Sequence, residues 1–291
     1  MSRTCLVTNV FWNLPDEAKQ YFEKNSDIHL LVCGGGKKRL DSLKDEWMSK
    51  YCIPDDAFKD NISHLNSSLN EWTTLYLVRK NLRVLPAVPA TANIGHCHFR
   101  RFFKREDLEE IDTCDGIVAE KMPLGVCGFP CSVKKQYELL HYEEDLDILE
   151  NLLKSATDFW SEDSWNEWCG LRFLYAPCNV WLLKRECFNM MMDELLPVML
   201  KLRELIDVAG RDDYQKRACA FLGERLVSYW LWSSDFRLIE KPLVEMKEWK
   251  PEGATDKRGI KDGVTVGDRC LPRIREWVLE NMVMKTQHRG K

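Results

Sequence analysis

The sequence predicts an α/β fold in which a mainly parallel sheet is flanked by helices and followed by a helical C-terminal part. The main observation is that short apolar runs alternate with amphipathic stretches in the first half of the chain. The second is size, because 291 residues, 45% of them hydrophobic, can bury one large core. Strands that alternate with helices form parallel sheets, which bind ligands at the carboxyl ends of their strands.

Apolar runs and helical periodicity assign the elements in chain order. Strands are expected at residues 4–10, 28–33, 93–99 and 115–119. Helices are expected at residues 16–23, 37–50, 69–81, 134–140, 143–153, 185–207, 214–232 and 271–284. We expect residues 1–240 to form one domain, and residues 241–291 to add a loop and a helix packed on that domain.

Charge and hydropathy limit the partners and the location. The formal net charge of -4 comes from interspersed acidic and basic residues, which argues against nucleic acid as the main partner. No apolar stretch reaches the roughly 20 residues that span a bilayer, and the N-terminus lacks a signal-peptide layout. The 12 cysteines are scattered singly, as reduced core thiols are. These features predict a cytoplasmic protein without a transmembrane segment.

The predicted strand at 93–99 ends in an unusual group of histidine and arginine side chains. His96 and His98 are alternate residues, so they point to one face and are candidate metal ligands. Arg100 and Arg101 are suited to neutralising a diphosphate through forked hydrogen bonds. The competing interpretation is a core histidine beside arginines that pair with nearby acidic residues.

Gly34, Gly35 and Gly36 follow the second predicted strand. Their backbone amides are candidates for contact with a phosphate, as in dinucleotide-binding proteins. The spaced G-x-G-x-x-G pattern is missing, however, so a plain tight turn is the stronger interpretation.

Asp212 and Asp213 open a predicted helix that is otherwise largely apolar. One aspartate is expected to cap the helix by accepting a backbone N–H. The other is then free to act as a carboxylate base, which a helix N-terminus keeps ionised. The residues alone leave a cap and a base equally supported.

Several tryptophans lie close together in the sequence, and they suggest either a stacking platform for a sugar ring or core packing. Core packing is favoured, because large aromatic residues dominate protein cores. The residues concerned are Trp160, Trp165, Trp168 and Trp181.

Read together, four blocks resemble a family of bacterial and viral glycosyltransferases that was first catalogued as a domain of unknown function. The family is linked to capsule, lipopolysaccharide and surface-glycan synthesis. The first block has D-N-I-S at 60–63, followed by a helix that contains Glu71, and the second is I-G-H-C-H-F-R-R-F-F at 94–103. The third runs from Gln136 to Leu146, and the last combines 178–188 with D-D-Y-Q-K-R at 212–217 and E-R-L at 224–226.

The resemblance implies a GT-A-like, Rossmann-related fold that passes a sugar from a nucleotide-diphosphate sugar to a hydroxyl group of a glycan acceptor. By analogy with inverting members of that fold, Asp212 or Asp213 is the expected base. The resemblance also assigns binding residues. Donor or diphosphate contacts are expected from Asn61, Ser63, Asn66, His98, Arg100, Arg101, Gln215 and Arg217, and acceptor contacts from Asn179, Trp181 and Glu224.

Two questions stay open at this level. His98, with His96 or Asp115, is expected to hold a divalent cation such as manganese or magnesium, or else Arg100 and Arg101 replace the cation. The competing functions are a non-catalytic glycan- or nucleotide-binding module and a methyltransferase. The missing acidic ribose-binding residue after a second strand counts against the methyltransferase.

Overall fold

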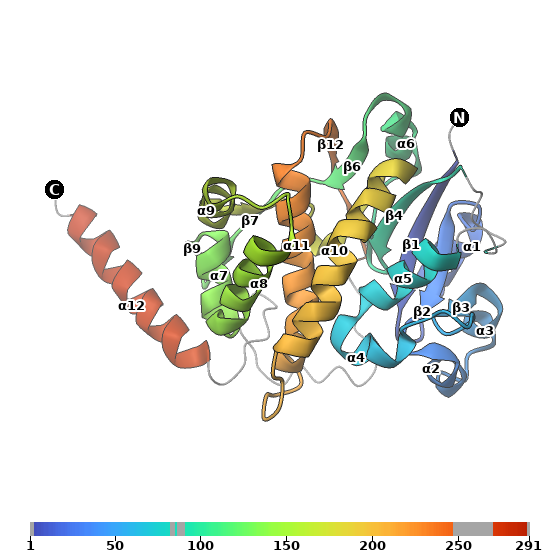
Figure 1. The fold of residues 1–291 in the computed structure, drawn as a ribbon, viewed down its shortest axis with the longest axis horizontal. Coiled ribbons are helices and arrows are strands. Elements are labelled where there is room, and N and C mark those ends of the chain that lie inside the picture. The colour runs from blue at the N-terminus through green and yellow to red at the C-terminus, as the bar shows by residue number, and fades with distance from the viewer. Residues whose placement is uncertain (1–2, 82–84, 86–90, 247–269, 290–291) are drawn as a thin grey trace.

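Nine strands form one sheet among the residues that the computed structural model describes, which are 3–81, 85, 91–246 and 270–289. Seven of them follow the spatial order β12-β6-β11-β4-β1-β2-β3 (Figure 1). Their bounds are β1 Thr4–Val10, β2 His29–Cys33, β3 Cys52–Pro54, β4 Asn93–His98, β6 Gly116–Ala119, β11 Trp181–Leu183 and β12 Leu238–Lys241. The short strands β5 (Arg101–Phe102) and β13 (Val244–Glu245) pair with each other beside β4.

The sheet is mainly parallel, as the sequence predicts. β1 pairs in parallel with β2 and β4, β2 with β3, and β12 with β6. The exception is β11, which is inserted antiparallel between β4 and β6. Because β11 is antiparallel to both neighbours, β4 and β6 run in the same direction and end at the same edge of the sheet.

Helices cover both faces of the sheet. One face packs against α5 (Glu71–Asn81) and α10 (Arg185–Leu205), which cross in front of it in Figure 1. The other face packs against α1 (Asp16–Lys24) and α2 (Gly36–Ser42). The remaining helices are α3 Glu46–Tyr51, α4 Asn66–Leu69, α6 Arg105–Leu108, α7 Val133–Leu140, α8 Glu143–Ala156, α9 Glu162–Gly170, α11 Ala218–Ser233 and α12 Cys270–Arg289.

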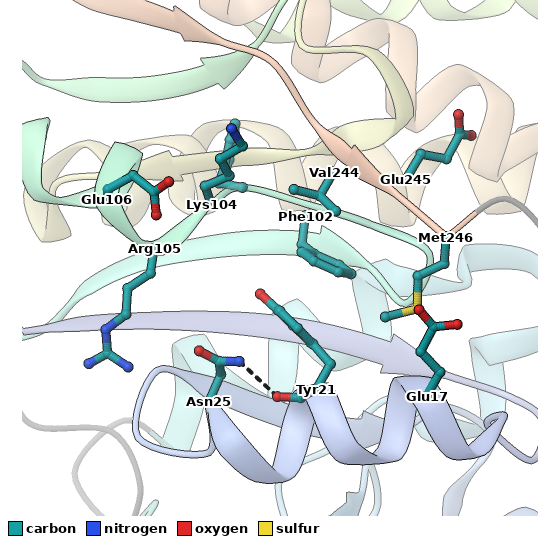
Figure 2. Close-up of a pocket in the computed structure, with 11 residues that line it drawn as sticks. Glu17, Tyr21, Asn25, Phe102, Lys104, Arg105, Glu106, Val244, Glu245 and Met246 are labelled. Atoms are coloured by element: carbon teal, nitrogen blue, oxygen red, sulfur yellow. Dashed lines mark hydrogen bonds between the residues drawn. The ribbon is translucent and has the colours of Figure 1, made fainter.

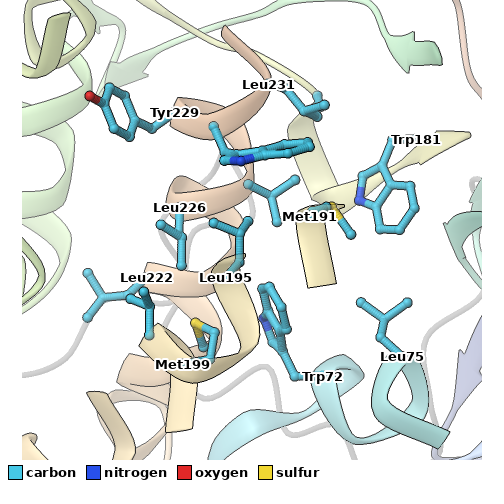
Figure 3. Close-up of a cluster of buried hydrophobic side chains, with 14 of the residues drawn as sticks. Trp72, Leu75, Trp181, Met191, Leu195, Met199, Leu222, Leu226, Tyr229 and Leu231 are labelled. Carbon is cyan, nitrogen blue, oxygen red and sulfur yellow. The ribbon is translucent and has the colours of Figure 1, made fainter. Parts of the chain in front are cut away.

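The largest core lies between the sheet and the helices α5, α10 and α11. Trp72 from α5 and Trp181 from β11 lie among leucines and methionines of α10 and α11 (Figure 3). Trp165 and Trp168 are also buried in this cluster. These three predicted platform residues, Trp165, Trp168 and Trp181, are therefore core residues.

Two predicted helices are each divided in the structure. The stretch at 37–50 breaks at Lys44, which has a φ of 51°, and Asp45 then caps α3 by accepting the backbone N–H of Met48 at 3.2 Å. The stretch at 69–81 breaks at Asn70, which has a φ of 45°. Lysine and asparagine in the left-handed region end a helix, because its hydrogen-bond ladder cannot continue through that conformation.

The sheet continues past residue 240, through β12 and β13, so a domain boundary at 240 would cut β12. The first turns of α12 contact α7, the start of α8 and the short strand β9 (Phe129–Pro130), with Arg273 paired to Glu143 at 2.9 Å and Trp277 edge-on to Phe129 at 5.8 Å. The predicted loop before α12 falls mostly on residues 247–269, outside the described residues. Among the described residues, no helix is long and apolar enough to cross a membrane.

Candidate active site

A pocket of about 290 Å³ lies at the carboxyl ends of β1 and β4, the edge where a parallel sheet is expected to bind ligands. β1 contributes Asn9, and β4 together with the turn after it contributes residues 96–101. The facing wall comes from the start of α5, the loop at 176–179 and the first half of α11. Its polar lining residues are Asn9, Asn70, Glu71, His96, His98, Arg100, Arg101, Cys178, Asn179, Arg217 and Glu224.

A second pocket of about 550 Å³ adjoins the first. The two share Phe11, Trp12, Asn70 and Arg217. The second pocket continues over the ends of β1 and β2 and is further lined by Gly34, Gly35, Arg39, Ser63, His64, Asn66 and Ser67. Together they form a cleft with an aromatic wall and Arg217 at the junction.

Two guanidinium groups that line the first pocket lack an ion-pair partner among the described residues. Arg100 lies over the ring of Phe99 at 5.2 Å, and Arg217 over the ring of Phe221 at 5.4 Å. Arg101, in contrast, pairs with Glu245 at 2.7 Å and donates to the Cys178 sulfur at 2.9 Å. Arg100 and Arg217 therefore provide positive charge for an anion, whereas Arg101 is already engaged.

Two carboxyl groups, Glu71 and Glu224, line the same pocket. Desolvation raises the pKa of Glu71, against the opposing effect of Arg217. Desolvation also raises the pKa of Glu224, and the charge of Glu71 adds to this, whereas Arg225 and Arg101 oppose it. A carboxyl group whose ionisation is opposed by burial and by a neighbouring carboxyl group is a recurrent arrangement for acid–base chemistry.

The loop that faces the strands has a strained backbone. Ala176, Cys178 and Asn179 all have positive φ values of 47°, 60° and 55°. This shape lets the Cys178 backbone N–H donate to Glu224 at 2.6 Å, which fixes one carboxylate oxygen. Strain of this kind is retained where the surrounding structure requires it, often at functional sites.

Asn179, in the loop at 176–179, forms hydrogen bonds with three other parts of the site. Its side chain donates to Glu71 at 3.2 Å and accepts from the Trp181 indole at 2.8 Å, and its backbone oxygen contacts Nδ1 of His96 at 2.6 Å. One residue thus links the sheet, the core and the carboxyl pair.

Replacing Asn179 by alanine is expected to lower the free energy of unfolding by about 2–3 kcal/mol, because the buried Trp181 N–H loses its acceptor and alanine resists a positive φ. Asn179→Gly separates the two causes, since glycine tolerates that φ. Equilibrium urea unfolding is the measurement. Equal stability of Asn179→Ala and the unaltered protein would contradict this role.

The histidines do not form a cation site with acidic side chains. Burial, together with Arg100 and Arg101, lowers the pKa of His98 to about 3, and Nδ1 of His98 accepts the Arg100 backbone N–H at 3.3 Å. In the described part of the chain, no three His, Cys, Asp or Glu side chains gather closely enough to hold a metal ion. The residues predicted as ligands, His96 and His98, therefore do not fit a cation site built from protein groups alone.

Asp115, the other predicted cation partner, is remote from His98. Leu183 of β11 pairs with Gly116 of β6 on one side and with Ile94 of β4 on the other. Asp115, which precedes Gly116, is therefore at the edge of the sheet where β4 begins. His98 is at the opposite end of that strand, about 15 Å away at the rise of an extended chain. Pairing His98 with Asp115 is thus wrong.

The glycine turn at 34–36 forms a tight turn rather than a phosphate cradle. The Gly34 N–H donates to the Val10 carbonyl at 3.2 Å, and the Gly35 N–H donates to Asp55 at 3.3 Å. The next amide after the turn, that of Lys37, donates to Asp56 at 2.8 Å. Carboxylates accept from the amides of Gly35 and Lys37 and would repel a phosphate.

The predicted donor residues of the D-N-I-S block mainly shape the second pocket. Ser63 and Asn66 line it, although the Ser63 hydroxyl bonds Asp55 and the Asn66 amide donates to Thr73 at 2.7 Å. Asn61 lines neither pocket, and its amide donates to the Phe58 carbonyl at 2.7 Å. This hydrogen bond stabilises the loop that contains Asn61.

The 212–217 segment contributes one side chain, Arg217, to the cleft. Asp212 accepts the backbone N–H groups of Tyr214 and Gln215 at 2.9 Å, as a helix cap does. The side chain of Asp213 is 99% exposed and pairs with Lys216 at 3.0 Å. Neither aspartate lines the two pockets.

Two further predicted binding residues point elsewhere. Gln215 is 1% exposed and donates to the Leu140 carbonyl at 2.8 Å, on the side of α7. Trp181, predicted to contact the acceptor, is fully buried, so it cannot touch a ligand in this conformation. Both assignments are corrected: these side chains hold the walls of the cleft in place.

The sequence interpretation missed Glu71, Asn9 and Asn70 as site residues. Asn9 carried a usable signal, because it is a polar residue near the carboxyl end of an apolar strand. Glu71 belongs to the first block of the resemblance, but its proximity to Glu224 follows only from the folded structure.

A third pocket, of about 580 Å³, lies on the other face of the sheet (Figure 2). Tyr21 of α1 stacks on Phe102 at 4.0 Å there, and the Asn25 amide donates to the Tyr21 carbonyl at 2.8 Å. Arg105 is paired with Asp27. Because much of its polar lining is already paired, this pocket is a weaker candidate for an anionic ligand than the cleft.

Comparison with known proteins agrees with the resemblance. Residues 24–235 match the family described as "Domain of unknown function (DUF4422)". Curated protein sequences give no significant match. Among solved structures, the apo structure of the bifunctional glycosyltransferase WbbM is similar, with a TM-score of 0.64 at 16% identity.

The similarity to WbbM covers 90% of this chain and 48% of that one, so this chain spans about half the length of the WbbM chain. At this identity the similarity establishes the fold, which is α/β with a mainly parallel sheet and is shared with a glycosyltransferase. The family match covers most of the sequence, and the chain therefore belongs to the DUF4422 family.

Proposed function

We propose that the protein is a glycosyltransferase that transfers a sugar from a nucleotide-diphosphate sugar to a hydroxyl group of a glycan acceptor. The observation that carries the proposal is the pairing, in one cleft, of two available guanidinium groups with two carboxyl groups of raised pKa. The resemblance to a glycosyltransferase fold supports it. This cleft has the chemistry that the reaction needs, with positive charge for the leaving diphosphate and a base for the acceptor.

In this proposal the nucleoside occupies the second pocket beside Phe11 and Trp12, and the diphosphate lies at the junction between Arg217 and Arg100. Charge-assisted hydrogen bonds from guanidinium groups stabilise the negative charge that develops on the leaving group. Neutral His98, whose Nδ1 accepts a backbone N–H, carries its proton on Nε2 and can donate it to a phosphate oxygen. We infer that the two guanidinium groups supply countercharge at the diphosphate and that His98 supplies a further hydrogen bond.

The acceptor hydroxyl attacks the anomeric carbon from the side opposite the diphosphate, which inverts the configuration. The bond between the anomeric carbon and the diphosphate oxygen breaks, and Glu224 takes the hydroxyl proton. We assign the base to Glu224 because one of its oxygens is fixed by the Cys178 N–H and its raised pKa favours proton uptake. The aspartates of 212–213 are the competing assignment, and the expected effect of each substitution is given in the Discussion.

Alanine replacement of Arg100 or Arg217 is expected to weaken binding of UDP or GDP by about 10- to 100-fold, the equivalent of one charge-assisted hydrogen bond. Isothermal titration with each nucleoside diphosphate, with EDTA or with added manganese or magnesium, measures this. Arg105→Ala is the matched control, because Arg105 lies in the pocket of Figure 2 and outside the cleft.

Two outcomes would contradict this assignment. Undiminished diphosphate binding by both cleft variants would exclude these arginines as the counter-charge. Failure of the unaltered protein to bind any nucleoside diphosphate or to hydrolyse any nucleotide sugar would contradict the function itself.

A further inference from the structure

An ion pair between Arg101 and Glu245 connects the cleft with the third pocket. Arg101 is in β5, and Glu245 is opposite it in β13. Arg101 lines the cleft, whereas Glu245 lines the third pocket (Figure 2). Nε of Arg101 donates to Oε1 of Glu245 at 2.8 Å, and Nη2 lies 2.7 Å from the same oxygen. A single carboxylate oxygen therefore accepts this whole edge of the guanidinium group.

The pair is weak compared with the buried ion pair of the chain. The side chains of Arg101 and Glu245 are 36% and 44% exposed, against 9% and 1% for Arg211 and Asp145. Exposed ion pairs contribute little, because water screens the attraction and two long side chains must be ordered. The other contact of Arg101 is with the Cys178 sulfur, which is a weak acceptor. A more highly charged anion in the cleft can therefore replace Glu245.

Three guanidinium groups act on one point of the first pocket, the imidazole of His98. Besides burial, the charges of Arg100, Arg101 and Arg217 each lower the pKa of His98. The proposed site of the diphosphate is in the same place, between Arg100 and Arg217. Of the three arginines, only Arg101 has an ion-pair partner in the described part of the chain. Release of Arg101 by Glu245 would add a third positive charge for the diphosphate.

The two carboxyl groups of the pocket increase the need for that third charge. Burial opposes ionisation of Glu71 and Glu224, whereas Arg217 favours it for Glu71 and Arg101 favours it for Glu224. When both glutamates are ionised, they offset two of the three guanidinium charges. A diphosphate carries at least two negative charges, so it requires the positive charge that Glu245 neutralises in the free protein.

We propose that Arg101 is a third diphosphate-binding residue, and that it exchanges Glu245 for a phosphate oxygen when the donor binds. This rests on the proposed glycosyltransferase function and deepens it. No covalent bond changes in the exchange, because N–H groups that donate to a carboxylate oxygen donate to a phosphate oxygen instead. Glu245 thus competes with the donor for Arg101 and lowers the affinity of the free site.

Glu245→Gln tests the competition, because glutamine keeps the size of the side chain and removes its charge. UDP is titrated calorimetrically, with EDTA or with added manganese or magnesium, whichever gives the unaltered protein its tightest binding. Glu245→Gln is expected to bind UDP about 3- to 5-fold more tightly, the equivalent of one exposed ion pair. Glu106→Gln is the matched control and should leave UDP affinity unchanged. Glu106 is also exposed and lines the third pocket, and it has no ion-pair partner among the described residues (Figure 2).

Arg101→Ala completes a double-mutant cycle with Glu245→Gln. It is expected to weaken UDP binding by about tenfold in the Glu245→Gln background. In the unaltered background the loss should be only about 2- to 3-fold, because removing Arg101 also removes the competition with Glu245. If Arg101 instead served only to hold the wall of the cleft, Glu245→Gln would loosen it and bind UDP more weakly.

Three results would overturn the inference. They are weaker UDP binding by Glu245→Gln, equal UDP affinities of Glu245→Gln and Glu106→Gln, and undiminished binding when Arg101→Ala is added to Glu245→Gln. Each of them leaves the proposed function intact, since UDP still binds to the unaltered protein. If the unaltered protein binds no nucleoside diphosphate, the function is contradicted and the exchange with it.

Discussion

Glu224→Gln is expected to reduce kcat for sugar transfer by about 10²- to 10⁴-fold, the usual contribution of a general base. Glutamine keeps the size of the side chain and an oxygen that can accept the Cys178 N–H. It cannot take the acceptor proton. Donor affinity should change little, since the guanidinium groups remain, so the loss should appear in kcat. Steady-state kinetics with a transferable donor and acceptor, together with donor titration, separate the two effects.

The aspartates supply the control. Asp213→Asn should retain near-normal kcat, because the Asp213 side chain is almost fully exposed and lies outside the cleft. Asp212→Asn keeps a capping oxygen and should also stay active. A normal rate for Glu224→Gln with a large loss in either aspartate variant would reinstate the base predicted from the sequence.

The pH dependence tests the coupling between the two glutamates. A base works in its ionised form, so kcat should fall as pH decreases through the raised pKa of Glu224. Glu71→Gln removes a neighbouring negative charge that opposes ionisation of Glu224. The pKa of Glu224 should then decrease, and the acidic limb of the rate profile should move to lower pH. If the acidic limb of the pH–rate profile did not move, Glu71 would have no effect on the pKa of Glu224.

Four of the nine strands, β1, β2, β4 and β6, were predicted from the sequence, because each is a mostly buried run of four to seven residues. β1 and β4 were assigned almost to the residue, at 4–10 and 93–99. The other five strands have only two to four residues each and were missed. β11 is one of them, and nothing local in Trp181–Leu183 indicates that it lies antiparallel between two strands remote in the sequence.

The candidate site was only partly predictable, and the reason is also physical. Arg100 was identified because positive charge at the end of a buried strand is unusual unless a ligand or an acid neutralises it. Glu71 was not identified, since a carboxylate at the start of a helix is stabilised by the helix dipole whether or not it has another role. Its contact with Asn179, 108 residues away, depends on the fold.

Motif membership alone did not distinguish catalytic from structural residues. Gln215 and Asp145 belong to blocks that resemble the glycosyltransferase family, yet both are buried in the contact between the helices and the 207–217 segment. Such residues support the site indirectly, because the segment that they hold carries Arg217 into the cleft. Their loss should therefore appear first as a loss of stability.

Asp145→Ala is accordingly expected to lower the free energy of unfolding by about 3–5 kcal/mol, the cost of leaving one member of a buried ion pair alone. Asp145 is 1% exposed and forms a two-pronged contact with Arg211, whose side chain is 9% exposed. Since small domains are stable by about 5–15 kcal/mol, this loss is a large share of the total. Urea unfolding monitored by circular dichroism measures it.

The double variant Asp145→Leu with Arg211→Met distinguishes the contribution of the two charges to stability from the contribution of the volume that the two side chains fill. It should be less destabilised than Asp145→Ala, because it removes both charges together. Both variants should also bind UDP more weakly where they remain folded, since Arg211 directly precedes the capped turn that positions Arg217. If Asp145→Ala were as stable as the unaltered protein, the pair would not hold this segment. If its stability fell while UDP affinity stayed unchanged, Arg217 would be positioned independently of the pair.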